Sequence, residues 1–220
     1  MATINHRQIM QGLERLYAAV VCDVLDDLDC RHQALPVSIR ALTPAKRIMG
    51  RALTARAVTV AAAPSEPYKM EIGAVDALSK DDVLVIDGDN NTSCGLWGEL
   101  LTTASKVKGA RGVIMSACTR DLWKIKDMDF PVFGIGCHPA DSKGRIDVIA
   151  VGAPIRLERV SVKTGDYVLG DEDGIVIIPR GKVMEAVRLA CIKVAKEDTF
   201  RQDLEKGIPM GEAFKKHGIL

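Results

Sequence analysis

Residues 82–121, DVLVIDGDNNTSCGLWGELLTTASKVKGARGVIMSACTRD, decide the fold. The stretch 82–87, four adjacent aliphatic residues between two aspartates, and the run 112–115 predict buried strands. Between them, 96–109 predicts a helix with its apolar residues on one face and Gly109 as a C-terminal cap. That face contains Leu100, Leu101, Ala104 and Val107. A strand, a helix and a strand in this order normally form a right-handed crossover between parallel strands.

The flanking segments add strands and helices to this unit. Residues 50–60 alternate polar with apolar or small residues and predict a half-buried strand, and 130–133 predicts another buried one. Residues 145–179 form short alternating stretches separated by glycines, which is typical of an antiparallel β layer. Residues 8–28 carry apolar side chains at intervals of three and four, as helices do.

We therefore expect a single mixed α/β domain over residues 1–220 with helices at both termini. The predicted parts are N-terminal helices at 6–28, an α/β core at 50–180 and a C-terminal helix at 182–206, which Gly207 and Pro209 end. The pattern is not that of a doubly wound dinucleotide domain.

The composition excludes several classes of protein. The chain of 220 residues has 30 basic and 29 acidic residues, so nothing in its overall charge favours nucleic acid or an anionic membrane. Charged residues interrupt every apolar stretch of the N-terminal segment, which predicts neither a signal peptide nor a membrane span. The 6 cysteines contain no C-x-x-C pair. We expect reduced thiols and a cytoplasmic location.

Common catalytic motifs are missing from the sequence. It contains no G-x-G-x-x-G after a strand, no G-x-x-x-x-G-K-[ST], no H-E-x-x-H and no G-x-S-x-G. The 4 histidines are far apart along the chain, which argues against a histidine-rich zinc site.

The first candidate site is residues 92–101, TSCGLWGELL, where the central helix should begin. Unpaired N–H groups of a first helical turn can bind a carboxylate or a phosphate. Small residues there let a ligand come close. The alternative is that Gly95 and Gly98 only allow the chain to turn tightly and pack.

The second candidate is Arg120-Asp121, just beyond the strand at 112–115. A guanidinium matches the geometry of a carboxylate or a keto acid, and an aspartate supplies a hard oxygen ligand for Mg²⁺. The alternative is that Asp121 is the N-cap of a short helix over 122–126 and Arg120 is a solvated charge. If the two strands are neighbours, both candidates open onto one crevice, as expected for a 2-oxo acid site.

Five blocks in this order give the sequence a family resemblance. They are Gly98-Glu-Leu-Leu101, Gly109-Ala-Arg-Gly-Val113, Arg120-Asp121, Phe130-Pro-Val-Phe133 and Gly170-Asp-Glu-Asp-Gly174-Ile-Val-Ile-Ile-Pro179. Together they resemble the RraA-like family, over about residues 50–207. The family includes 4-hydroxy-4-methyl-2-oxoglutarate / 4-carboxy-4-hydroxy-2-oxoadipate aldolases and the regulator of ribonuclease activity A.

The resemblance implies a swivelling β/β/α fold that assembles as a homotrimer or a hexamer, with the active site at a subunit boundary. It implies a class II pyruvate aldolase that uses a divalent metal, Mg²⁺ or Mn²⁺, with oxaloacetate decarboxylation as a related activity. Arg120 would bind the keto-acid end of the substrate, and Asp121 would hold the metal largely through waters. The backbone of Gly98, Glu99, Leu100 and Leu101 would bind the substrate carboxylate.

A glutamate from the C-terminal helix of the neighbouring subunit completes the site in the aldolases, and Glu197 is the matching residue here. The alternative is that Glu197 is a solvated charge on a helix that covers its own subunit. The sequence departs from the aldolases' D-G-x-x-R-D block, since Ser116 and Ala117 replace the aspartate and the glycine.

Two other activities compete with the lyase. A protein regulator of a ribonuclease can keep the Arg-Asp pair, so it stays an alternative. A methyltransferase, an old label in this family, would need a glycine-rich cofactor loop that the sequence lacks. Trp97 and Trp123 flank the predicted crevice, where we expect them mainly to pack, and Asp171 to Asp173 should form an acidic turn with Gly174.

Overall fold

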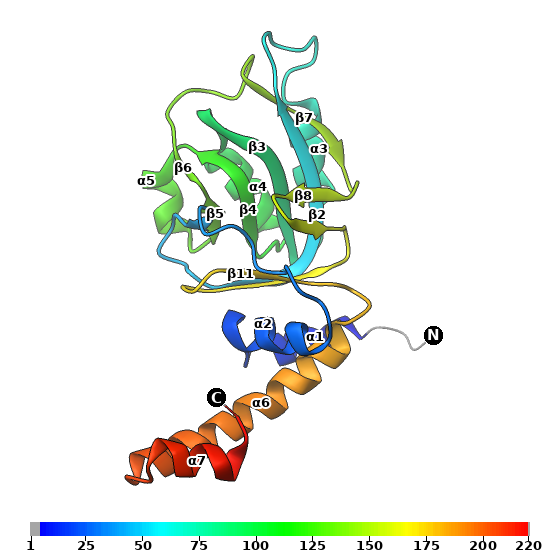
Figure 1. Cartoon of the computed structure of the whole chain (residues 1–220). Helices are drawn as coiled ribbons and strands as arrows, with labels where there is room; N and C mark the ends of the chain where they lie inside the picture. The colour runs from blue at the N-terminus through cyan, green and yellow to red at the C-terminus, as the bar shows by residue number, and fades with distance from the viewer. Residues whose placement is uncertain (1–4, 220) are drawn as a thin grey trace.

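The computed structural model describes residues 5–219, in which one mixed sheet has helices at both ends of the chain (Figure 1). The sheet order is β1-β5-β4-β3-β2-β10-β11, with β6 beside β4 and β7 beside β2, while β8 and β9 form a separate hairpin. Its strands are β1 (Arg40–Ala41), β2 (Ile48–Thr59), β3 (Asp82–Trp97), β4 (Gly112–Thr119), β5 (Val132–Gly134), β6 (Gly136–Cys137), β7 (Ile146–Val151), β10 (Tyr167–Gly170) and β11 (Ile175–Ile178). The hairpin strands are β8 (Ile155–Leu157) and β9 (Val160–Val162).

Strands β2 to β5 run parallel, and β7, β10 and β11 add antiparallel pairs. The central strand, helix and strand unit is therefore present as predicted. The helices are α1 (His6–Leu13), α2 (Ala18–Asp27), α3 (Lys69–Asp76), α4 (Glu99–Val107), α5 (Leu122–Ile125), the 3₁₀ turn η1 (Lys126–Met128), α6 (Val183–Glu205) and α7 (Met210–His217). None of the helices in the described part of the chain is both long and apolar enough to cross a membrane.

The alternation of side chains along β3 builds two cores, one on each face of the sheet. Leu84 and Ile86 pack with Val75 of α3, and Val83 and Val85 pack on the other face with the β8–β9 hairpin. Successive residues of a strand point to opposite faces, so the uninterrupted apolar run in the sequence is what a strand covered on both sides requires.

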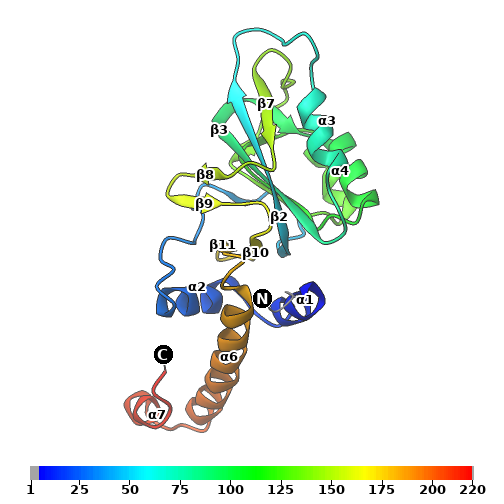
Figure 2. The same cartoon turned by 90° about the vertical axis from the view of Figure 1, so that its right-hand side faces the viewer.

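A third core joins the two ends of the chain. Helices α1, α2 and α6 lie together below β10 and β11 (Figure 2). The acidic turn between those strands connects to this core, because Asp171 Oδ2 accepts a hydrogen bond from the backbone N of Ala18 at 2.7 Å. It therefore caps the first turn of α2. Gly174 has φ +146°, which an L side chain rarely adopts.

Three sequence expectations are corrected. Strand β3 does not end near residue 87 but continues, with irregular pairing to β4, as far as Trp97, so α4 begins only at Glu99. The 145–179 strands pair antiparallel as expected, but β7, β10 and β11 join the main sheet. Helix α7 was not predicted.

The expected apolar face of α4 is wrong as well. Leu100 is 77% exposed and Val107 is 84% exposed, whereas Thr102 and Ser105 are buried. Thr102 can be buried because its hydroxyl is fully used: Oγ1 donates to the carbonyl of Gly98 at 3.0 Å and accepts from Trp97 Nε1 at 2.8 Å.

Candidate active site

A pocket of 440 Å³ opens where β3 and β4 end, beside α3 and α4. Gly95 to Gly98 contribute one wall, and Arg120 and Asp121 contribute another. This is the edge of a parallel sheet at which α/β proteins bind ligands, since the strands end there and the helices begin. The crevice expected from the sequence is therefore present and open.

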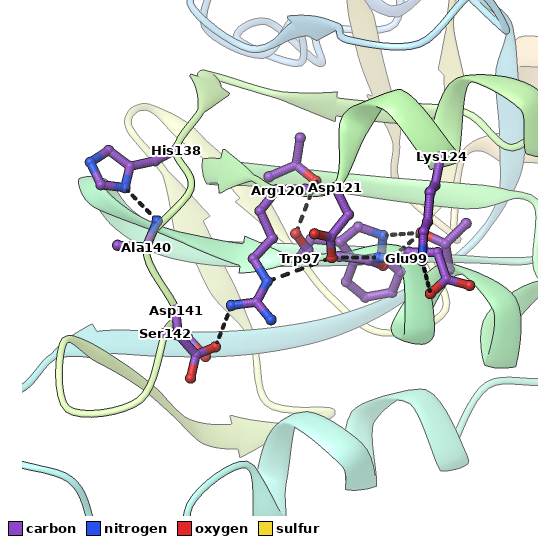
Figure 3. A network of polar contacts seen from close by, with 12 residues as sticks. Trp97, Glu99, Arg120, Asp121, Lys124, His138, Ala140, Asp141 and Ser142 are labelled. Atoms are coloured by element: carbon purple, nitrogen blue, oxygen red, sulfur yellow. Dashed lines mark hydrogen bonds and ion pairs between the residues drawn. The ribbon is translucent and has the colours of Figure 1, made fainter.

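Arg120 and Asp121 follow the end of β4 and converge. The backbone N of Arg120 donates to the carbonyl of Trp97 at 2.8 Å, which fixes the end of β4 against β3. Asp121 has φ +55°, and this left-handed conformation turns the chain into α5. The Nε atom of Arg120 lies 3.6 Å from Asp121 Oδ2, and Figure 3 shows the guanidinium between two carboxylates.

The alternative interpretation of Asp121 is half correct. A short helix, α5, does begin at the next residue, but the Asp121 side chain makes no capping hydrogen bond to it. Its Oδ2 atom instead accepts from the backbone N of Glu99, at 3.3 Å, in the first turn of α4. Asp121 therefore connects the end of β4 to the start of α4.

The two glycines of the first candidate segment are needed for close approach. A Cβ on Gly95 would lie 2.7 Å from Arg120 Cβ and 2.8 Å from the carbonyl oxygen of His138. A Cβ on Gly98 would lie 2.8 Å from Asp121 Oδ2. Neither glycine has a positive φ, so the backbone conformation does not require glycine at these positions. Glycine is required because a side chain would collide with the neighbouring atoms.

The predicted backbone cradle lies at the start of α4. Gly98, Leu100 and Leu101 line the pocket. The Glu99 side chain is directed elsewhere, with Oε1 accepting from Thr103 and Oε2 3.9 Å from Lys124 Nζ. The backbone N of Glu99 already donates to Asp121 Oδ2, so the N–H groups of Leu100 and Leu101, which have no partner inside the helix, are the ones that can receive a carboxylate.

Asp141 and Tyr68 line the pocket, and sequence reasoning did not select them. Asp141 Oδ1 accepts from Arg120 Nη1 at 2.7 Å. The Tyr68 hydroxyl donates to Asp141 Oδ2. The Tyr68 hydrogen bond and the Arg120 charge hold the pKa of Asp141 below its usual range. The two residues thus keep the guanidinium in place.

Glu71 is the third residue that sequence reasoning missed. It lies on α3, lines the pocket, and Ser142 Oγ donates to its Oε2 at 3.5 Å. Burial and the nearby Asp141 carboxylate raise the pKa of Glu71 to about 7. A carboxyl group with this pKa exchanges protons near neutral pH, which is the property of a general acid or base.

Glu197 is not part of this pocket within one chain. It lies on α6 and accepts a hydrogen bond from the Tyr17 hydroxyl. Burial and the Glu197 carboxylate raise the pKa of Tyr17 to about 12. Glu197 is therefore not a purely solvated charge, and its role toward a neighbouring subunit stays a prediction.

The residues that depart from the aldolase pattern do not line the pocket. Both contact Gly88 of β3 instead. Ser116 Oγ accepts a hydrogen bond from the backbone N of Gly88 at 2.9 Å. The Cβ atom of Ala117 is so near Gly88 that a Cβ added to Gly88 would lie 2.7 Å from it. Trp97 is buried, as a packing residue should be, but Trp123 is 74% exposed.

Asp121 is the residue of the pocket that could hold a divalent metal ion. The described residues contain no group of three or more His, Cys, Asp or Glu side chains able to enclose a metal ion. Asp121, however, is half-exposed at the pocket and has one long hydrogen bond. Mg²⁺ often keeps several waters and takes only one or two protein carboxylates. The donor set thus suits a water-rich Mg²⁺ site on Asp121.

The mixed sheet with terminal helices and the Arg-Asp pair after β4 match one known protein family. The family model described as "RraA-like: Aldolase/RraA" matches residues 18–177. The chain therefore belongs to the RraA-like family, and the predicted swivelling β/β/α fold is confirmed.

Solved structures share this fold. An uncharacterized protein from Pseudomonas syringae pv. tomato superposes with a TM-score of 0.85 at 22% identity, over 96% of this chain and 98% of that one. Streptomyces coelicolor RraAS2, described as an unusual member of the RNase ES inhibitor RraA protein family, gives 0.80 at 24% identity, over 89% and 97%.

Two relatives are similar over most of this chain. A protein of Halalkalibacterium halodurans named "Putative 4-hydroxy-4-methyl-2-oxoglutarate aldolase" is 28% identical over 81% of this chain and 80% of its own length. Protein DlpA of Legionella pneumophila is 24% identical over 93% of this chain, which spans only 33% of DlpA.

Proposed function

We propose that the protein is a divalent-metal-dependent lyase that releases pyruvate from a 2-oxo acid with a hydroxyl group on C4. The main support for this proposal is that Arg120, Asp121 and the first turn of α4 meet at one pocket. Relatives named as aldolases agree with the same reaction class. Oxaloacetate decarboxylation is a related reaction that forms the same pyruvate enolate.

In this proposal the substrate binds by its keto-acid end. The C1 carboxylate takes the free amides at the start of α4, next to Leu100 and Leu101. The 2-oxo oxygen faces Arg120, whose contacts with Asp121 and Asp141 use only part of its five N–H donors. Asp141 and Tyr68 are positioning residues, because they act through the guanidinium.

The reaction breaks the C3–C4 bond. Its electron pair forms a second bond between C2 and C3, and the π pair of the C2 carbonyl moves onto the 2-oxo oxygen to give the enolate. The C4 hydroxyl loses its proton as C4 becomes a carbonyl. The enolate carbonyl then re-forms as C3 gains a proton, which gives pyruvate. Arg120 stabilises the negative charge that develops on the 2-oxo oxygen. Glu71, with its pKa near 7, accepts the hydroxyl proton and can return one to C3.

A Mg²⁺ or Mn²⁺ ion held by Asp121 would supply a further positive charge near the same oxygen. A Schiff-base mechanism is not favoured, since it needs a desolvated lysine at the reacting carbonyl. No lysine is among the described residues that line the pocket.

The proposal includes a homotrimer or a hexamer in which Glu197 of a neighbouring copy approaches the pocket. The exposed apolar side chains of Leu100 and Val107 on α4 support coverage by a second copy. Sedimentation or light scattering measures the mass, and a monomer would contradict this part.

The experiment for the activity is a pyruvate-release assay with a 4-hydroxy-2-oxo acid and Mg²⁺. We expect activity that EDTA removes, that added Mg²⁺ restores, and that Asp121→Ala abolishes while the circular dichroism spectrum is kept. A folded wild-type protein that releases no pyruvate but binds a ribonuclease would contradict the lyase and support the regulator.

A further inference from the structure

We propose that the chain has a second binding site, which takes a small organic anion by its carboxylate or phosphate group. A cavity of about 390 Å³ opens near the starts of β2 and β3. Figure 2 shows β10 and α1 close to the lower end of β2. Asp82, the first residue of β3, lines this cavity, whereas Trp97, the last residue of the same strand, lines the pocket that contains Arg120. The two cavities have no lining residue in common, so the second one lies outside the catalytic pocket.

Two guanidinium groups from separate segments border the second cavity. Arg51 lies on β2, and Arg180 follows β11. The Arg180 side chain lies over Gly165, because a Cβ on this glycine would be 3.5 Å from Arg180 Cδ and 3.6 Å from Arg180 Nη1. Burial raises the pKa of Tyr167, and the charges of Arg51 and Arg180 partly offset this rise. Both guanidinium groups therefore lie near the Tyr167 hydroxyl.

These guanidinium groups have N–H donors left for an anion. Arg180 forms no ion pair with any carboxylate of residues 5–219, and Arg51 uses Nε for Asp82 Oδ1 at 2.9 Å, which leaves its terminal N–H groups. Asp82 is the one carboxylate among the described residues that line the cavity, and its Oδ2 already accepts from the backbone N of Ser79. The lining thus has an excess of positive charge, and a guanidinium fork matches the oxygens of a carboxylate or a phosphate.

The size and the remaining lining of the cavity suit a small molecule. Its volume is within the range of small-molecule sites and exceeds what a single inorganic ion fills. The ring of His6 is held at its edge, since His6 Nδ1 lies 2.9 Å from the Tyr167 hydroxyl oxygen. None of the described residues that line it is on α4, so a second copy that covers α4 would not use them.

Calorimetric titration of the full chain with succinate and with inorganic phosphate, in separate experiments without metal, tests this site. The titrations use the Arg120→Gln variant, so that the anion cannot pair with the arginine of the catalytic pocket. We expect saturable binding of one anion per chain for at least one of the two compounds, and the tighter one shows which group the site prefers. Absence of saturable binding of both would overturn the proposal without bearing on pyruvate release.

Further substitutions in the same background locate the bound anion. Arg180→Gln should weaken binding at least about tenfold, because a desolvated charge pair is lost. Arg180→Lys keeps the charge but not the fork, so we expect a smaller loss. Arg188→Gln is the matched control, an exposed arginine on α6 outside the cavity, and should change the affinity by less than about twofold. Circular dichroism checks that each variant is folded. An affinity that is the same in Arg180→Gln and Arg188→Gln would contradict the site.

Discussion

Gly98 and Asp121 lie so close that a Cβ atom on Gly98 would be 2.8 Å from the Asp121 carboxylate oxygen. The position of the Asp121 side chain, after β4, therefore depends on the residue at position 98, after β3. Because the contact is with the far end of a flexible side chain, a larger residue at Gly98 would move the carboxylate before it disturbed the fold.

Gly98→Ala should consequently lower activity more than stability. We expect kcat/KM for pyruvate release to fall by about tenfold or more, because the Asp121 carboxylate is displaced from its place beside Arg120. The free energy of unfolding should fall by no more than about 1 kcal/mol. Gly73→Ala is the matched control: nothing lies within 4 Å of a Cβ there, and alanine suits α3 better. Full activity in Gly98→Ala would show that the position of Asp121 is unimportant.

Asp141→Asn should weaken substrate binding. The variant removes the charge that holds Arg120 Nη1, so the guanidinium loses its fixed direction. We expect KM to rise by about tenfold and kcat to change less, the scale of one charge-assisted hydrogen bond. Tyr68→Phe should shift KM in the same direction by a smaller factor, because Tyr68 acts only through Asp141. Steady-state kinetics measure both, and an unchanged KM in Asp141→Asn would exclude this positioning role.

Glu71 gives a pH-dependent prediction. Its pKa is raised from 4.5 to about 7 in the folded chain, so between these values the folded state keeps a proton that the unfolded state has released. The unfolded state binds fewer protons there, and the free energy of unfolding must fall as the pH rises through this window. Glu71→Gln removes the dependence.

The variant should match the wild type near pH 4 and exceed its stability near pH 8 by on the order of 2 kcal/mol. Urea unfolding at the two pH values measures this difference, with exposed Glu158→Gln as the control. In kcat/KM, the wild type should lose activity below about pH 7, and Glu71→Gln should lose this limb of the profile. Parallel stability curves for wild type and Glu71→Gln would show that Glu71 titrates normally.

Asp171 provides a test of the fold that is independent of the pocket. Asp171→Ala removes the acceptor for the backbone N of Ala18 at the start of α2, together with the exposed acceptor for the backbone N of Asp173. We expect a loss of about 1 kcal/mol in the free energy of unfolding, with pyruvate release unchanged. Asp173→Ala, in the same exposed turn, should cost much less. Equal losses would mean that the cap contributes nothing.

Local patterns were sufficient for the central strands, the order of the central unit and the position of the Arg120-Asp121 pair after β4. Residues 83–86 are apolar on both faces of a strand, and Gly109, at φ +78°, ends α4 as a cap should. These features depend on neighbours in the chain, so a single sequence contains them. The length of β3 escaped prediction, because residues 88–97 are polar and glycine-rich and become strand only by pairing with β4.

The pocket residues that the sequence did not predict depend on contacts between segments far apart in the chain. Tyr68 and Asp141 are held together across the pocket, and neither has a spacing to Arg120 that a motif could show. The raised pKa of Glu71 comes from burial against such segments. The buried face of α4 escaped prediction for a related reason, since Thr102 is buried only because Trp97 and Gly98 satisfy its hydroxyl.

A crystal structure of the protein with pyruvate and Mg²⁺ is the most direct test of the central claim. We expect the pyruvate carboxylate on the amides of the first turn of α4, its oxo oxygen facing Arg120, and the ion held on Asp121 through waters. Pyruvate and the ion bound elsewhere, or a pocket that stays empty at saturating concentrations of both, would contradict the proposed lyase.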